Sequence, residues 1–456
     1  MLRIMFVSII ASIVVSLILC TSTFAIIEDT HPSEDVTPLQ PENSDTLPEW
    51  VPRIIGAQIN AIYQIVPPFK NPYEGNNSFS FNKNNGDDIT RTYGVYFGSN
   101  IMSYLQGYFD VEIANATGIG EGKGLGGYVN GDVLTADPYI ARVYLRYLIP
   151  LSSETSKVDR DIDQLPGNEP NERIEIRVGK YSTADVFDQN RYANNARTYF
   201  MNYSFITNPS YDYAGDPSGY SWGFAISYVQ PSWQLTYGAM MVLRTTVNSS
   251  ILDKDIWRAR GDNLELTLKP NNIGTVLRLL AFYNQGRMGN YAEAIALSST
   301  PNVDINEKPG RTKYGFGINL EQPIMDDGET GFFARIGWND GNNDDVSYAE
   351  VDKNLSIGAH LNGVHWSRPE DHIGVAFGFN GISAIHQKYL SNGGYGALIG
   401  DSNLKYGLEQ VFEIYYRIQV WKYFQITHDF QFIINPGYNQ DRGPVYVYGI
   451  RVRLYF

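Results

Sequence analysis

Residues 445–456, VYVYGIRVRLYF, decide the fold of this chain. Alternate residues from Tyr446 to Phe456 are apolar or aromatic, whereas the residues between them include Arg451 and Arg453. Successive side chains of a β-strand point to opposite faces, so this period of two predicts a strand with one apolar and one more polar face. The strand ends on an aromatic residue, which a soluble protein has no need of.

The same alternation recurs through most of the chain upstream. In residues 105–113, for example, Phe109 and Val111 alternate with Tyr108, Asp110 and Glu112. A soluble β-sandwich also alternates, so periodicity alone does not choose between the two architectures. We predict 16 strands and leave out a weaker candidate, 198–206, which asparagine and proline residues interrupt. The predicted strands are 53–63, 91–98, 105–114, 138–148, 172–180, 220–229, 232–244, 258–268, 275–284, 311–320, 331–338, 354–362, 372–379, 406–420, 421–432 and 444–456.

Along the chain, the connections between these strands mostly alternate between long and short. Segment 149–171 is the exception, because it is long where a short connection is expected. Short periplasmic turns, long outer loops and two termini on the same side are typical of outer-membrane proteins. The sequence therefore predicts an all-β fold, a 16-stranded antiparallel transmembrane β-barrel. We expect the last strand, ending in Phe456, to be the signal recognised by the barrel-assembly machinery.

Three regions are expected along the chain. Residues 1–25 have a basic residue, an apolar run and small residues ending at Ala25, which predicts a cleaved signal peptide. Residues 26–52 are acidic and proline-rich and predict an extended periplasmic arm. Residues 53–456 form the predicted barrel. The one cysteine, Cys20, leaves with the signal peptide, and the formal net charge of −14 argues against nucleic acid as a partner.

The C-terminal third resembles the carbohydrate-selective porins of the OprB family. The matching stretches are HWSRPEDHIG at 365–374, EIYYR at 413–417, DFQFIINPGYN at 429–439 and RGPV at 442–445. The resemblance implies an outer-membrane porin of a Gram-negative bacterium that passes small sugars by passive diffusion. It also implies contact with outer-membrane lipid.

Charged and aromatic residues on the polar strand faces are the candidate pore lining. Arginine donates several hydrogen bonds from a planar fork, which suits neighbouring sugar hydroxyls, and carboxylates accept from hydroxyls. The alternative is a ladder of ion pairs that only stiffens the wall. Tyrosines on this face could stack on sugar rings, although most tyrosines are expected at the lipid–water boundary. The candidate substrate-binding residues are Tyr108, Asp110, Glu112, Arg142, Tyr144, Arg146, Arg177, Arg278, Glu413 and Arg417.

Two connections have expected roles. Residues 182–195 lie in a long outer connection. Two alternatives are open for this segment: it folds into the pore, or it forms a surface loop. Residues 365–371 fall in a periplasmic turn and are expected to be structural, although they carry part of the resemblance.

Other functions remain open from the sequence. The channel could be a general or anion-tuned pore, and a soluble glycan-binding protein would also be rich in strands. A barrel enzyme is disfavoured because no serine–histidine motif is present, so we expect no enzyme activity. The six histidines do not have metal-ligand spacing, and we expect no metal and no cofactor.

Overall fold

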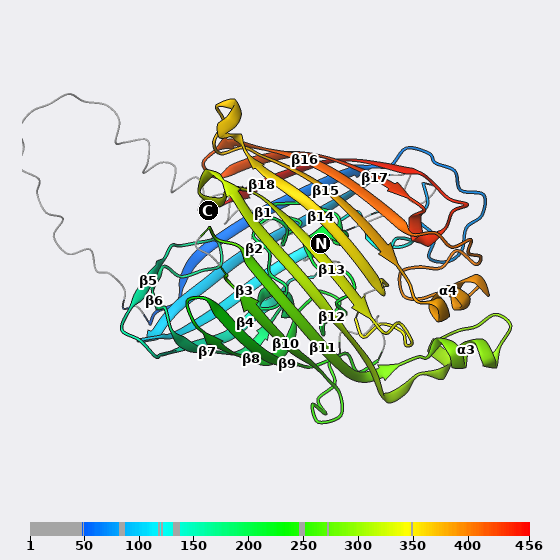
Figure 1. The fold of residues 1–456 in the computed structure, drawn as a ribbon, viewed down its shortest axis with the longest axis horizontal. Coiled ribbons are helices and arrows are strands. Elements are labelled where there is room, and N and C mark those ends of the chain that lie inside the picture. Colours follow the sequence, from blue (N-terminus) through cyan, green and yellow to red (C-terminus); the bar gives the residue numbers. More distant parts are fainter. Residues whose placement is uncertain are drawn as a thin grey trace, which may run out of the picture.

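The computed structural model describes residues 48–456 except 49, 82–86, 117–118, 120–121, 131–136, 246–250, 271–272 and 348–349. Sixteen antiparallel strands form a closed barrel (Figure 1). Strands β1 and β18 close it, with Gln58 opposite Tyr455 and Ile65 opposite Tyr448. The barrel strands are β1 (Arg53–Ile65), β2 (Asp87–Met102), β3 (Leu105–Asn115), β4 (Tyr139–Pro150), β7 (Arg173–Tyr181), β8 (Ser221–Val229), β9 (Trp233–Met240), β10 (Arg260–Leu268), β11 (Val276–Met288), β12 (Lys308–Met325), β13 (Thr330–Asn339), β14 (Lys353–Asn362), β15 (His372–Gly381), β16 (Glu409–Trp421), β17 (Phe424–Ile434) and β18 (Val445–Tyr455).

The predicted period of two is confirmed on the walls. In β18 the outward Tyr448 is 52% exposed, whereas the inward Arg451 is 1% exposed. An apolar outer surface around a closed ladder of backbone hydrogen bonds is the arrangement that a bilayer requires of a β-structure. The predicted 16-stranded barrel is therefore confirmed, as is the omission of 198–206, which contains only the short helix α2 (Tyr203–Ile206).

The two ends of the barrel differ in their connections. Short turns such as 103–104 and 422–423 lie at the end that holds Arg53 and Phe456, which we call the turn end. Long connections lie at the opposite end, the loop end, where Figure 1 shows α3 (Tyr291–Leu297) and α4 (Ala384–Ser391). The sequence did not predict these helices, and none in the described ranges is long and apolar enough to cross a membrane. Short 3-10 helices occur in connections at both ends. They are η3 (Thr183–Asp185), η4 (Asp304–Asn306), η5 (Asp326–Gly328), η6 (Gly363–Trp366) and η7 (Pro436–Tyr438).

Residues 151–172, the turn-end connection, join β4 to β7. They are the long exception that the sequence indicated, and they contain a hairpin that it did not predict. Strands β5 (Thr155–Val158) and β6 (Gly167–Pro170) form this hairpin outside the barrel sheet. Figure 1 places it at the same end as the C-terminus.

Residues 182–220, the inward loop, join β7 to β8 and fill much of the lumen. Phe200 and Phe205 of this loop are fully buried, and they belong to one cluster with Phe333 of β13 and Tyr415 of β16. Phe200 packs edge-on against Tyr415 at 4.9 Å between ring centroids. The barrel interior is therefore packed on the side of β13 and β16.

Candidate pore constriction

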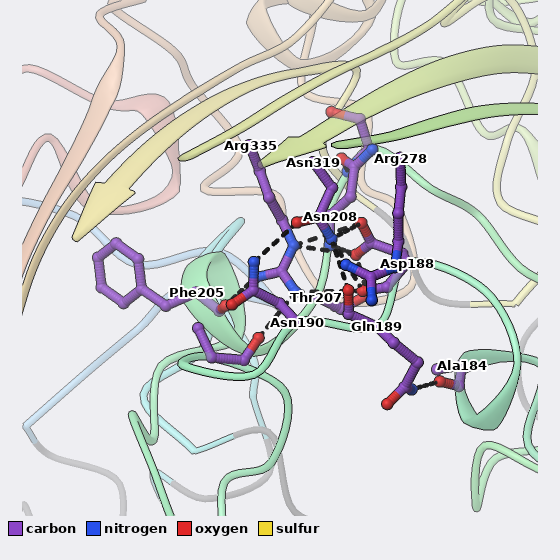
Figure 2. Close-up of polar contacts among 12 residues, drawn as sticks. Ala184, Asp188, Gln189, Asn190, Phe205, Thr207, Asn208, Arg278, Asn319 and Arg335 are labelled. Atoms are coloured by element: carbon purple, nitrogen blue, oxygen red, sulfur yellow. Dashed lines mark hydrogen bonds and ion pairs between the residues drawn. The ribbon is translucent and has the colours of Figure 1, made fainter. Parts of the chain in front are cut away.

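Arg335 of β13 binds the inward loop to the barrel wall. The Arg335 guanidinium donates to the carbonyl oxygens of Phe205 at 2.6 Å and Ala193 at 2.7 Å. Its Nε lies 3.1 Å from the Asp188 carboxylate. Figure 2 shows these contacts converging on the loop, with Asn319 of β12 donating to Asp188 at 2.7 Å. The prediction that residues 182–195 fold into the pore is therefore confirmed.

A second set of contacts holds the middle of the inward loop. Arg451 of β18 donates to the carbonyl oxygens of Ala196 at 2.6 Å and Thr198 at 2.8 Å. Glu413 of β16 accepts from the backbone N–H groups of Met201 at 2.5 Å and Asn202 at 3.0 Å. Because the wall side chains satisfy backbone groups that would otherwise be buried unpaired, the loop has one defined path across the lumen.

A cavity of about 770 Å³ remains between the inward loop, the turn-end connection and the wall of β3, β4 and β7. Its charged lining consists of four arginines and four carboxylates, so the formal charges balance. These residues are Arg142, Arg146, Arg177, Arg197, Asp161, Asp163, Glu169 and Asp185.

Arg142 and Arg146 of β4 are held by carboxylates. Arg142 donates to both Asp185 oxygens at 2.7 and 2.8 Å, and a third contact reaches Asp110 at 3.4 Å. Arg146 donates to both Glu175 oxygens at 2.9 and 2.7 Å and also pairs with Glu169. Such bidentate pairs fix the guanidinium planes and leave few free donors.

Arg177 of β7 differs from these arginines. Its nearest carboxylate oxygen, on Glu175, is 3.7 Å away, and its Nε has no hydrogen-bond partner among the described residues. The guanidinium instead lies over the Tyr144 ring at 4.8 Å from the centroid. Arg177 therefore brings unused hydrogen-bond donors to the cavity.

The tyrosines of the cavity wall are covered. Tyr108 and Tyr144 stack on each other at 4.8 Å with an angle of 12° between the rings. Both are buried, because Arg177 covers Tyr144 and the turn-end connection reaches Tyr108 through the Leu165 N–H, which donates to the hydroxyl at 3.5 Å. They pack the wall and do not present open faces for stacking.

A family model described as the carbohydrate-selective porin, OprB family, matches residues 69–456. The chain belongs to this family. It is a porin of the outer membrane of a Gram-negative bacterium, and its lumen is a passive channel for carbohydrates. The family and its fold are those of channels rather than of enzymes.

One of the solved structures that resemble this chain supports the fold. The structure of OprB from Pseudomonas putida at high pH has a TM-score of 0.66 and 13% sequence identity, over 89% of this chain and 94% of that chain. The DcaP channel of Acinetobacter baumannii has a TM-score of 0.47 and 12% identity, over 89% and 97%. A loop-deletion mutant of OmpT from Vibrio cholerae has a TM-score of 0.46 and 10% identity, over 89% and 99%. No curated protein sequence matches the chain significantly.

The structure brings five of the ten predicted site residues of this porin to the cavity. They are Tyr108, Arg142, Tyr144, Arg146 and Arg177.

Asp110 and Glu112 lie behind the cavity lining. Asp110 contacts Arg142, as described above. Glu112 is fully buried and accepts from Arg197 at 2.6 and 3.0 Å and from the Tyr220 hydroxyl at 3.1 Å. These two carboxylates therefore position lining residues rather than line the cavity.

The other three predicted residues are on the packed side of the lumen. Glu413 holds the inward loop, as described above, and Arg417 donates to the Thr198 carbonyl at 3.3 Å. Arg278 of β11 pairs with Glu321 and lies 4.0 Å from Glu265. Strand parity correctly placed them inside the barrel, but the loop covers Glu413 and Arg417, and Arg278 does not line this cavity.

Sequence reasoning missed the lining residues that come from connections. Asp163, Gln164 and Arg197 follow no strand period, so parity could not place them. Asn194 also lines the cavity, and it belongs to 182–195, the segment that the sequence offered as a pore loop. The only available signal was the length of the connections that contain them.

The turn at 365–371 is structural, as predicted. Asp371 accepts from the Tyr416 hydroxyl at 2.6 Å and from the backbone N–H of Gln419 at 2.9 Å. It thereby ties the β14–β15 turn to β16. In the part of the chain that the structure describes, no three His, Cys, Asp or Glu side chains are arranged to hold a metal ion.

Proposed function

We propose that this porin passes uncharged sugars in preference to charged ones, and that Arg177 is the main hydrogen-bond donor to the sugar in the cavity. The observation that carries this proposal is the pairing of the lining charges. Arg142, Arg146 and Arg197 each have a carboxylate oxygen within 2.7 Å. The carboxylate oxygen nearest to Arg177 is 3.7 Å away, and the Arg177 Nε has no hydrogen-bond partner among the described residues.

A balanced lining disfavours ions of either sign. An anion that approaches the arginines also meets four carboxylates, and a cation meets four arginines, so neither recovers the cost of losing its hydration. A neutral sugar loses only hydrogen bonds to water, which arginine and amide groups replace. A cavity of about 770 Å³ is within the range of small-molecule sites, and weak binding there permits flux.

The predicted partners and chain regions fit this assignment. The apolar outward face suits outer-membrane lipid, and the aromatic C-terminus suits the barrel-assembly machinery. The proposed signal peptide, 1–25, and most of the proposed arm, 26–52, lie outside the described residues, so their roles remain proposals.

Liposome swelling tests charge selectivity with three sugars of similar size: glucose, glucosamine and glucuronate. We expect glucose to enter fastest through the refolded porin. Faster entry of glucuronate would contradict the proposal and support an anion-tuned pore.

Arg177→Gln tests the sugar contact. We expect about tenfold weaker glucose binding, measured as glucose-induced current noise in planar bilayers, because a hydrogen bond from a charged donor contributes about 1.5 kcal/mol. Arg191→Gln is the matched control, since Arg191 has the same charge as Arg177, lies on the inward loop that follows β7 and does not line the cavity. Equal glucose binding by Arg177→Gln and the wild type would remove Arg177 from the site.

A further inference from the structure

The turn-end connection folds into the barrel mouth and reaches β1. Arg160 donates from Nε to the carbonyl oxygen of Ile55 at 2.9 Å, and from Nη2 to the same oxygen at 2.5 Å. The guanidinium also lies 6.0 Å from the centroid of the Phe456 ring. The connection thus crosses the inner face of the wall from β4 to β1, although it begins and ends on neighbouring strands.

The contact with β1 is close enough to require glycine. A Cβ atom at Gly56 would lie 2.1 Å from the carbonyl oxygen of Ile162. Leu165, two residues beyond Asp163, is buried in a cluster with Ile55 and Tyr108. Close backbone approach and a buried leucine indicate a docked segment rather than a loose surface loop.

Ion pairs fix the rest of the connection to β3 and β4. Glu169 of the hairpin pairs with Arg146. The Asp163 carboxyl lies 3.6 Å from Arg142, which also contacts Asp110 at 3.4 Å. These contacts set the connection opposite the inward loop, with the cavity between the two.

The barrel itself does not need this segment. Pro150 and Arg173 are cross-strand partners, so a short turn could join β4 directly to β7. All the other connections at the turn end are short. The closure of the sheet therefore does not require the length of the turn-end connection, and the extra residues instead contribute to the lumen.

We propose that the turn-end connection is a second selectivity element of the pore, and that Asp163 and Gln164 accept hydrogen bonds from the hydroxyls of the passing sugar. Four lining residues come from this connection: Asp161, Asp163, Gln164 and Glu169. The inference rests on the proposed function, in which sugars pass through this cavity.

The chemistry of a sugar hydroxyl explains why both sides are needed. A hydroxyl donates one hydrogen bond and accepts others, whereas a guanidinium only donates and a carboxylate only accepts. Arg177 on the wall can satisfy the acceptor side of the sugar. Asp163, only partly buried, and the Gln164 amide on the connection satisfy the donor side.

The main test replaces residues 152–171 of the full-length porin with Asn-Gly, a two-residue hairpin turn. We expect single-channel conductance to rise severalfold, and the entry rate of maltotriose into liposomes to approach that of glucose. Unchanged conductance and unchanged relative rates, in a variant whose heat-dependent gel shift shows a folded barrel, would overturn the proposal.

A point variant keeps the proposal testable if the shortened chain does not fold. Asp163→Ala should weaken glucose-induced current noise severalfold. Asp159→Ala is the matched control, because Asp159 is on the same connection, pairs with Lys157 at 2.6 Å and is exposed. Equal glucose binding by Asp163→Ala and Asp159→Ala would overturn the sugar contact.

The two proposals fail in different ways. If Arg177→Gln leaves glucose binding unchanged while the shortened variant opens the pore, the proposed sugar contact of Arg177 fails and the second selectivity element stands. If Arg177→Gln weakens glucose binding while the shortened variant behaves as the wild type, only the second selectivity element fails.

Discussion

Arg335 and Arg177 occupy equivalent inward positions on two sides of the same barrel, yet they do different work. Arg335 is fully buried and donates to backbone carbonyls of the inward loop. Arg177 faces the cavity with its Nε unpartnered. Both lie on β-strands with the same alternation. The path of the loop over the wall, and not the wall itself, therefore decides whether a lumen arginine is structural or available to a sugar.

Among the substitutions that test this comparison, Arg335→Met should have the largest effect on stability and conductance. It removes the donors to the Phe205 and Ala193 carbonyl oxygens and leaves the buried Asp188 carboxylate without its ion-pair partner. Breaking a buried ion pair in this way lowers the free energy of unfolding by about 3–5 kcal/mol. We expect a lower urea midpoint in detergent micelles and a higher conductance as the loop loosens.

A second substitution checks the cause of this effect. Asp188→Asn in the Arg335→Met background should recover part of the lost stability, because it removes the unpaired buried charge. An Arg335→Met porin with wild-type conductance and midpoint would break the assignment of Arg335 as the loop anchor.

The docking of the turn-end connection should depend on pH through Asp163. We expect this effect to be smaller than that of Arg335→Met and larger than that of Arg191→Ala. Burial raises the pKa of Asp163 from 3.8 to about 6, with Asp185 raising it further and Arg142 and Arg177 opposing the rise. Because the docked state holds the proton more tightly than the undocked state, this contribution to docking is complete below about pH 4 and is lost as pH rises through about 6.

Conductance should therefore increase between pH 4 and pH 7 in the wild type. Asp163→Asn, which stays neutral at every pH, should flatten this dependence. A pH profile of single-channel conductance that is the same in both proteins would show that Asp163 does not control docking.

Arg191→Ala should have the smallest effect. Arg191 belongs to the inward loop, but its ion pair with Glu329 is exposed, with 42% and 49% of the two side chains accessible. Exposed pairs contribute at most about 1 kcal/mol. We expect a urea midpoint close to that of the wild type, and a loss as large as that of Arg335→Met would remove the contrast between exposed and buried loop contacts.

The barrel and the family could both be predicted from the sequence. Alternation in segments such as 105–113 and 445–456 specifies which side chains face lipid, because strand geometry makes this a local property. The stretches in 365–445 carried the family resemblance, which the match over 69–456 confirmed. Parity also placed all the predicted site residues on strands whose polar face turns to the lumen.

The roles of those residues depend on contacts between segments that are distant in the sequence. Arg451 meets Ala196 across 255 residues of chain, and Arg335 meets Asp188 across 147. The inward loop and the turn-end connection follow no period that could foretell these contacts. Their paths depend on which buried backbone groups and charges find partners across the lumen, and that is a property of the closed barrel as a whole. The same constraint leaves the Arg177 Nε without a hydrogen-bond partner among the described residues, with the nearest carboxylate oxygen 3.7 Å from the guanidinium.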